Sequence, residues 1–274
     1  MGRRASWPGR YARHVRWTLR SRAAEHAWYL PFARRKYGHM MVCDASEMLI
    51  DGFTRSACVY AAVAFQLAQP KPVRLAHLIH SPAHIIDGVQ RGVPTLVTIR
   101  EPEDVVMSCL LREPHTSAPQ LLDAYVRFYG ALSPYRRGFV VGDFRRVTSD
   151  FNLVVREVND RFGTSFAEPD TVDGSPERVF AFIDERARRP PWEAHIGYVM
   201  SGLETLDDLA AARRLSAGDV APTGGAPSPF EDRVARPSAY KEARKAAMRD
   251  RYLVAELDRR RLRAVEIYRT FVER

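Results

Sequence analysis

The sequence has little cysteine and no motif that would use it. The three cysteines among 274 residues, Cys43, Cys58 and Cys109, stand in or near apolar runs, without CxxC or other metal-ligand spacing. This scarcity excludes a disulfide-rich scaffold and argues against a cysteine-based zinc site. We predict small buried thiols in a reducing compartment, and we expect no bound metal.

Long hydrophobic runs are also missing. The basic N-terminus is not followed by the apolar stretch of a signal peptide, and the uncharged residues 56–70 are too short to span a bilayer. We therefore expect a cytoplasmic protein. What the sequence does have is a hydrophobic fraction of 46%, which is enough for a sizeable core.

Net charge is concentrated in one part of the chain. Residues 1–40 hold ten Lys and Arg and one acid, Glu25, so they carry the whole formal charge of +9, whereas residues 41–274 balance 32 basic against 32 acidic residues. We interpret residues 1–40 as a basic N-terminal arm, and favour a solvated basic helix that caps the domain. An anionic membrane surface, contacted peripherally, or an acidic partner is the alternative, and nucleic acid is the partner we expect least. The apolar residues interleaved with the arginines are Trp17, Trp28, Tyr29 and Leu30.

Short apolar runs alternate with helical patterns from residue 47 onward. These strands lack polar alternation, which is typical of a parallel sheet covered on both faces. We predict a three-layer α/β fold with a mostly parallel central sheet, formed by residues 41–274 as one domain. The predicted strands are 48–50, 75–80, 94–99 and 138–142, and the predicted helices are 56–68, 82–91, 102–112, 118–136 and 150–162.

The C-terminal third has a less regular pattern. Residues 175–215 look helical but irregular, and residues 217–230, with six Gly or Pro among fourteen, indicate a flexible loop. Residues 238–272 are highly charged and predict a long C-terminal helix.

The first candidate binding segment follows the strand predicted at 48–50. It reads Asp51-Gly-Phe-Thr-Arg-Ser-Ala-Cys58. At such a junction a helix N-terminus presents unpaired N–H groups and a positive dipole end, and Arg55 and Ser56 add a charged fork and a hydroxyl. The Walker pattern GxxxxGK[ST] is absent. The segment is either an anion site or an ordinary turn with an exposed arginine.

The second candidate segment begins at Arg100, directly after the strand predicted at 94–99. Ligands of parallel sheets bind outside the carboxyl ends of strands, so Arg100 stands where a phosphate is expected. Ser108 lies about two helical turns farther on and could return its hydroxyl to the same place. A structural salt bridge is an equal interpretation of Arg100 alone.

Taken together, these segments resemble the nucleotide-binding segments of sulfotransferases. Pro94–Arg112 (PTLVTIREPEDVVMSCLLR) is similar to the second segment of that family, and residues 49–62 (LIDGFTRSACVYAA) are similar to the first. Leu78–Pro82 resembles the stretch that supplies the family's catalytic histidine, and Gly138–Asp150 resembles a later strand and its acidic turn. The resemblance covers residues 47–165 and implies a topology like that of P-loop NTPases.

The resemblance implies sulfuryl transfer from 3′-phosphoadenosine 5′-phosphosulfate to a hydroxyl or amine of a small-molecule or glycan acceptor, by in-line displacement. Arg55 would stabilise the leaving oxygen, and His80 would accept the proton, with His77 and His84 as alternative bases. The implied nucleotide ligands are Arg55, Ser56, Ala57 and Cys58 at the 5′-phosphosulfate and Arg100 and Ser108 at the 3′-phosphate, with Arg236, Ser238 and Lys241 closing over it. A solvated basic helix start is an equal interpretation of the last three.

The first loop departs from the family's pattern. Ala57 replaces a glycine, Cys58 and Val59 replace hydroxyl-bearing residues, and Arg55 replaces the commoner lysine. A missing glycine restricts backbone approach to phosphate, and a missing hydroxyl removes a donor. The alternative function is therefore a catalytically weak homologue that binds a nucleotide or a partner through the same cleft.

Overall fold

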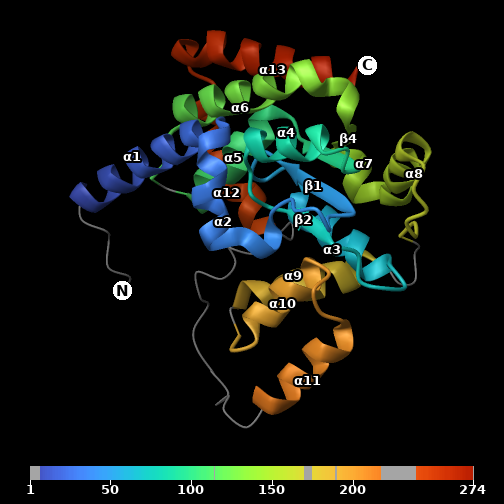
Figure 1. Cartoon of the computed structure of the whole chain (residues 1–274). Coiled ribbons are helices and arrows are strands. Elements are labelled where there is room, and N and C mark those ends of the chain that lie inside the picture. Colours follow the sequence, from blue (N-terminus) through green and yellow to red (C-terminus); the bar gives the residue numbers. More distant parts are fainter. Residues whose placement is uncertain (1–6, 114, 170–174, 189, 217–238, 274) are drawn as a thin grey trace.

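The computed structural model describes the whole chain except residues 1–6, 114, 170–174, 189, 217–238 and 274 (Figure 1). Its centre is a parallel sheet with the strand order β2-β1-β3-β4. Each neighbouring pair is parallel, with Ile50 opposite His77 and Gly52 opposite Thr98. The strands are β1 (Met48–Gly52), β2 (Leu75–His77), β3 (Thr95–Ile99) and β4 (Val140–Asp143).

The strand order places helices on both faces of the sheet, as the sequence predicts. From β1 the chain passes through α3 (Cys58–Ala68) to β2 at one side, and then returns through α4 (Pro82–Gln90) to β3 at the other. Because parallel crossovers are right-handed, this reversal puts α3 on one face and α4 on the opposite face. The path from β3 to β4 runs through α5 (Pro102–Arg112) and α6 (Ala118–Leu132) on the α4 side.

Two apolar cores result, one on each face. Leu49 and Val97 pack with α4, α5, α6 and α13 (Asp258–Val272), which lie above the sheet in Figure 1. Met48, Ile50 and Leu96 pack with α3, α8 (Phe151–Phe162), α9 (Pro176–Arg188) and α10 (Glu193–Met200) on the other side. The strands therefore bury both faces, which explains why their sequences lack polar alternation.

The remaining elements extend these layers. The N-terminal segment contributes α1 (Trp7–Ala23), η1 (Ala27–Tyr29), α2 (Leu30–Tyr37) and η2 (Gly38–Met40). Its part near residue 25 is fixed to α6, where Arg127 forms a 2.7 Å ion pair with Glu25. None of the described helices is both long and apolar enough to cross a membrane. The other elements are η3 (Ser133–Gly138), α7 (Phe144–Ser149), α11 (Leu206–Ser216), α12 (Ala239–Tyr252) and η4 (Ala255–Leu257).

Three sequence predictions need correction. The single helix predicted over 238–272 is two helices, because the chain turns after Tyr252 so that Tyr252 and Leu257 are both buried. The strand predicted at 75–80 ends at His77, since Leu78 and His80 have φ values of 58° and 54°. Within Gly138–Asp150, which resembled a strand followed by an acidic turn, residues 144–149 form the helix α7. The loop predicted at 217–230 lies outside the described residues.

Gly52 is required by the close approach of β1 to β3. A Cβ atom at this position would stand 2.2 Å from the carbonyl oxygen of Thr98. Gly130, in the last turn of α6, has no atom within 4 Å of the same hypothetical Cβ.

We expect Gly52→Ala to lower the free energy of unfolding by about 2–3 kcal/mol, because a backbone clash forces the two strands apart. The matched control Gly130→Ala should raise it by about 0.5–1 kcal/mol, since alanine reduces the freedom of the unfolded chain. Urea denaturation measures both. Equal effects of the two substitutions would contradict the close approach.

Candidate anion-binding site

The candidate site lies at the carboxyl edge of the sheet, where β1 and β3 end side by side. The loop 53–57 leaves β1, and Arg100 follows the end of β3. The chain reverses its direction across the sheet between these two strands, and ligands of open α/β sheets bind at such a switch point. The juxtaposition of the two predicted segments is therefore a consequence of the strand order.

The backbone of the loop is shaped to present N–H groups. Arg55 and Ala57 have φ values of 69° and 70°, a left-handed conformation that side-chain-bearing residues rarely adopt. Turns that include left-handed residues gather successive N–H groups into a concavity that favours anions. Ala57 precedes α3 and provides no side-chain cap. The N–H groups of the first turn of α3 are therefore left for another acceptor.

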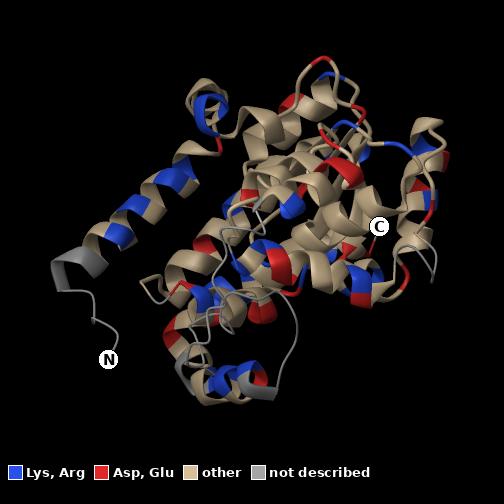
Figure 2. Ribbon diagram, turned by 90° about the horizontal axis from the view of Figure 1, so that it is seen from below, with Lys and Arg blue, Asp and Glu red and all other residues tan. Residues whose placement is uncertain are grey.

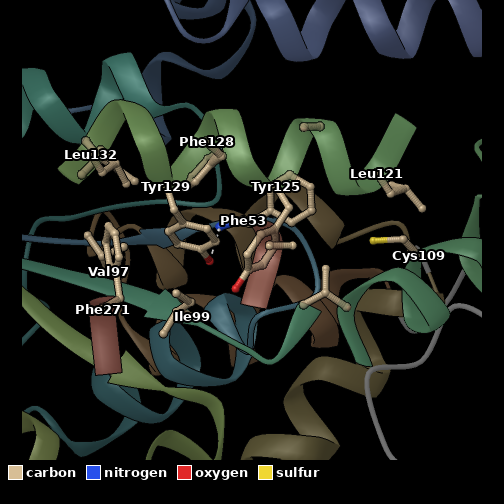
Figure 3. Close-up of a cluster of buried hydrophobic side chains, with 14 of the residues drawn as sticks. Phe53, Val97, Ile99, Cys109, Leu121, Tyr125, Phe128, Tyr129, Leu132 and Phe271 are labelled. Atoms are coloured by element: carbon tan, nitrogen blue, oxygen red, sulfur yellow. Dashed lines mark hydrogen bonds between the residues drawn. The ribbon is translucent and has the colours of Figure 1, made fainter. Parts of the chain in front are cut away.

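Tyr129 of α6 ties the loop to β3. Its hydroxyl donates to the carbonyl oxygen of Thr98 at 2.9 Å and accepts from the N–H of Phe53 at 3.3 Å. Figure 3 shows the Tyr129 ring between α6 and the sheet, in contact with Phe128 and close to Phe53. The Ser56 hydroxyl also lies 3.4 Å from that of Tyr129 and is fully buried. Contrary to the predicted role, the Ser56 hydroxyl points into the interior.

Arg55 and Ser108, which the sequence assigned to opposite phosphates, contact each other. Arg55 Nε donates to Ser108 Oγ at 2.8 Å. Burial, followed by the positive charges of Arg112 and Arg100, lowers the pKa of Arg55 to about 10. Among the described residues, no carboxylate forms an ion pair with Arg55. The site therefore gathers positive charge around a neutral hydroxyl.

Arg100 is held in place by three elements. Its guanidinium lies 3.8 Å from the centre of the Phe144 ring in α7, and its Nη2 is 3.0 Å from Asp104 in α5. Its carbonyl oxygen accepts a hydrogen bond from the Tyr125 hydroxyl of α6 at 2.8 Å. The sequence left open that Arg100 forms a structural salt bridge, and its ion pair with Asp104 is such a contact. The side chain is 13% exposed.

The fully buried Asp51 carboxylate organises the loop that carries the histidines. It accepts hydrogen bonds from the N–H groups of Gly52, Ile79 and His80 at 2.8–3.2 Å. Burial raises the pKa of Asp51, but hydrogen bonds and charge from His80 and His84 outweigh it and hold the pKa well below its usual range. A permanent negative charge therefore lies behind the first loop.

The structure does not favour any of the three histidines as a proton acceptor. His80 Nδ1 donates to the carbonyl oxygen of Gly52 at 2.8 Å and lies 3.3 Å from Asp51. Burial lowers the pKa of His80, yet its contacts with Asp51 and Cys58 raise the pKa to about 10 overall. A protonated imidazole cannot accept a proton at neutral pH, so the base role predicted for His80 meets a physical obstacle.

The two alternative bases are buried in structural positions. His84 is fully buried, and its Nε2 accepts a hydrogen bond from Val42 N at 2.9 Å. His77 contacts Ser201 Oγ at 3.1 Å, and burial lowers its pKa to about 3. His80, with 29% of its side chain exposed, is thus the histidine of the three that reaches the surface.

Asp51, Cys58 and His80 place possible metal ligands within 4.8 Å of one another. The Asp51 oxygens already accept backbone N–H groups, and Cys58 Sγ lies 3.0 Å from the Thr98 hydroxyl. These contacts engage the Asp51 and Cys58 atoms in hydrogen bonds within the protein. We assign the trio a structural role.

The predicted C-terminal ligands are only partly described. Lys241 lies in α12 and is 8% exposed, which does not fit the alternative of a solvated helix start at this residue. Arg236 and Ser238 lie outside the described residues. Ala57 and Cys58 stand at the start of α3, and their predicted role as nucleotide ligands stays a prediction.

Sequence reasoning missed several residues of this edge. Arg112 ends α5 and adds positive charge near Arg55. Tyr125 and Tyr129 stand four residues apart on one face of α6. Tyr125 holds the backbone of Arg100, and Tyr129 holds that of Thr98. Their helical spacing is the sequence feature that could have indicated a shared role. Nothing in the sequence indicated the contact between Phe144 and Arg100, because it depends on how α7 folds.

Two surface hollows of the described structure lie elsewhere. One follows the exposed side of α13, and the other lies between β4, α8 and α13. Neither is lined by Arg55, Arg100 or Ser108. No known family, curated protein or solved structure matches the chain.

We expect Tyr129→Phe to lower the free energy of unfolding by about 1–3 kcal/mol, because the buried N–H of Phe53 and the Thr98 carbonyl lose their shared partner. Tyr198→Phe is the control, since the Tyr198 ring is partly exposed and its hydroxyl bonds to no described residue. That control should change stability by less than about 0.5 kcal/mol. Equal stability of both variants would mean that Tyr129 does not hold the loop.

The charged His80 should make stability depend on pH. Its pKa rises from 6.5 to about 10 on folding, so its contribution is full below pH 6.5, declines above that value and is gone above about pH 10. His80→Asn keeps a residue that tolerates the left-handed backbone but removes the charge.

Chemical denaturation at pH 6 and pH 9.5 measures this contribution. Wild-type protein should lose more stability between the two values than His80→Asn does, and the control His26→Asn, at an exposed position, should behave like wild type. Parallel losses in wild type and His80→Asn would show that His80 is neutral.

Proposed function

We propose that the carboxyl edge of β1 and β3 binds an adenine nucleotide with phosphates at its 3′ and 5′ positions. We further propose that the protein is a sulfotransferase that uses 3′-phosphoadenosine 5′-phosphosulfate as donor. The observation that carries this proposal is the placement of Arg55 and Arg100 just after the adjacent ends of β1 and β3, at the switch point of the sheet. Burial, followed by the charges of Arg112 and Arg100, lowers the pKa of Arg55, and an anion bound beside Arg55 would offset these effects.

The positions of the two main arginines favour two separate phosphates. Arg55 belongs to the loop that opens α3, where backbone N–H groups can hold the 5′-phosphosulfate. Arg100 belongs to the neighbouring strand end and is fixed by Phe144 and Tyr125, which suits a rigid contact with a 3′-phosphate. The loop 53–57, which leads from β1 into α3, is also our reason for proposing a relationship to P-loop folds.

In the proposed reaction, the acceptor oxygen or nitrogen forms a bond to sulfur while the bond from sulfur to the 5′-phosphate oxygen breaks. Negative charge grows on that leaving oxygen, and Arg55 with the N–H groups of α3 would stabilise it. The loop would keep donor and acceptor in line. The acceptor's proton would leave to solvent or to a group of the acceptor, since a charged His80 cannot take it.

A second function has support from two observations. The positive charge on His80 removes a general base, and the contact between Arg55 and Ser108 joins two groups that a donor would need to engage separately. Both favour a protein that binds the nucleotide without transferring sulfate. Ala57 and Val59 in the first loop favour the same alternative.

We expect Arg100→Ala to weaken binding of 3′-phosphoadenosine 5′-phosphate by about tenfold or more, because a charge-assisted contact to the 3′-phosphate is lost. Binding of adenosine 5′-phosphate should change little, and Arg100→Lys should retain part of the affinity. Arg145→Ala, at an exposed position of α7, is the matched control and should leave both affinities unchanged. Isothermal titration calorimetry measures them.

The same titration separates the proposals. Absence of 3′-phosphoadenosine 5′-phosphate binding to wild-type protein would end both. If the nucleotide binds, incubation of the donor with phenol, alcohol, amine and glycan acceptors should release 3′-phosphoadenosine 5′-phosphate. If 3′-phosphoadenosine 5′-phosphate binds but none of these acceptors causes its release from the donor, the result would favour the nucleotide-binding function.

A further inference from the structure

The outward side of α1 and α2 combines positive charge with exposed apolar side chains. Leu19, Trp28 and Phe32 are 63%, 60% and 62% exposed. Arg16, Arg20 and Arg35 are exposed beside them. We call these six residues the N-terminal surface. Figure 2 shows α1 at the edge of the molecule, with basic residues spaced along it.

Contacts between side chains join the parts of this surface. The guanidinium of Arg20 in α1 lies 5.9 Å from the centre of the Tyr37 ring in α2. Trp28 packs edge to face against Phe32, with ring centres 6.4 Å apart. The first contact joins α1 to α2, and the second joins η1 to α2, so the exposed residues of this segment belong to elements that are packed together.

The acidic residue of this part of the chain does not weaken its charge. Glu25 is the one acid within residues 1–40. It forms a 2.7 Å ion pair with Arg127 of α6 and is 18% exposed, so its charge is turned toward the body of the protein. Residues 11–40 hold no other acidic residue.

We propose that the N-terminal surface docks onto an anionic lipid membrane. Anionic headgroups attract juxtaposed Lys and Arg, while tryptophan, phenylalanine and leucine enter the boundary between headgroups and acyl chains. A solvated basic helix, the interpretation favoured from the sequence, does not account for an indole, a phenyl ring and a leucine that are each more than half exposed.

The apolar side chains also favour lipid over a nucleic acid. Phosphate groups would satisfy the arginines, but they offer nothing to Leu19, whose side chain lies between Arg16 and Arg20 along α1. Since no described helix can span a bilayer, the contact is interfacial, with α1 and α2 lying on the surface.

Sedimentation of the full chain with large unilamellar vesicles at 0.1 M NaCl tests this proposal. We expect binding to vesicles of phosphatidylcholine and phosphatidylserine in a 3:1 ratio, and at least about tenfold weaker binding to phosphatidylcholine alone. Trp28→Ala with Phe32→Ala, and separately Arg16→Glu with Arg20→Glu, should each reduce binding by about tenfold or more.

Matched controls come from exposed positions of other helices. Leu215→Ala with Leu262→Ala removes two side chains that are 84% and 71% exposed, and Arg259→Glu with Arg263→Glu reverses two exposed charges on α13. Both should bind like wild type. Circular dichroism and urea denaturation verify that every variant folds.

A second readout reports insertion directly. Bromine-labelled lipids in the 3:1 vesicles should quench tryptophan fluorescence, and Trp28→Phe should abolish most of that quenching while retaining binding. Equal binding to both vesicle types, equal loss in the control variants or no quenching would overturn the proposal. So would tight binding to a single-stranded RNA oligonucleotide that depends on Arg16 and Arg20, together with no binding to vesicles.

Discussion

The buried carboxylate of Asp51 is the interaction on which the carboxyl edge depends. It stands near the end of β1 and accepts N–H groups from its own strand and from the segment that follows β2. Leu78 and His80 hold left-handed backbone conformations in that segment, and each costs about 1 kcal/mol or more. The charge-assisted hydrogen bonds from Ile79 and His80 to Asp51 offset this cost. Without them the connection from β2 to α4 would have no fixed path beside the first loop.

A second constraint is the close approach of β1 and β3. Gly52 allows the strands to meet, and Tyr129 then bridges Phe53 and Thr98 across the gap. Tyr129 thus holds Phe53, the first residue of the loop, against β3. The first loop therefore has a buried negative charge behind it, at Asp51. Positive charges from Arg55, Arg100 and Arg112 lie on its other side. Positive charge that is already in place favours binding of an anion, and it disfavours a side chain that has to accept a proton.

The N-terminal segment is connected to this framework. The Ser81 hydroxyl donates to the carbonyl oxygen of Ala24 at 2.6 Å, and the N–H of Ala83 donates to the same oxygen. The start of α4 thus joins the histidine-bearing segment on one side and the turn after α1 on the other. If the proposed membrane contact through α1 and α2 forms, these hydrogen bonds would hold the carboxyl edge of β1 and β3 at a fixed position relative to the lipid surface.

The sequence by itself determined the α/β class, the four strands and most of the helices, because these follow from local apolar periodicity and from proline and glycine signals. It also determined that Arg55 and Arg100 share one edge, since adjacent parallel strands end together. Only the tertiary structure decided that Ser56 faces inward, that Arg55 meets Ser108 and that contacts with Asp51 raise the pKa of His80. These properties arise from partners 28 to 73 residues away in the chain, such as Asp51 and Tyr129, which no local pattern contains. The break between α12 and α13 has the same origin, because burial of Tyr252 and Leu257 against other helices overrides a continuous helical pattern.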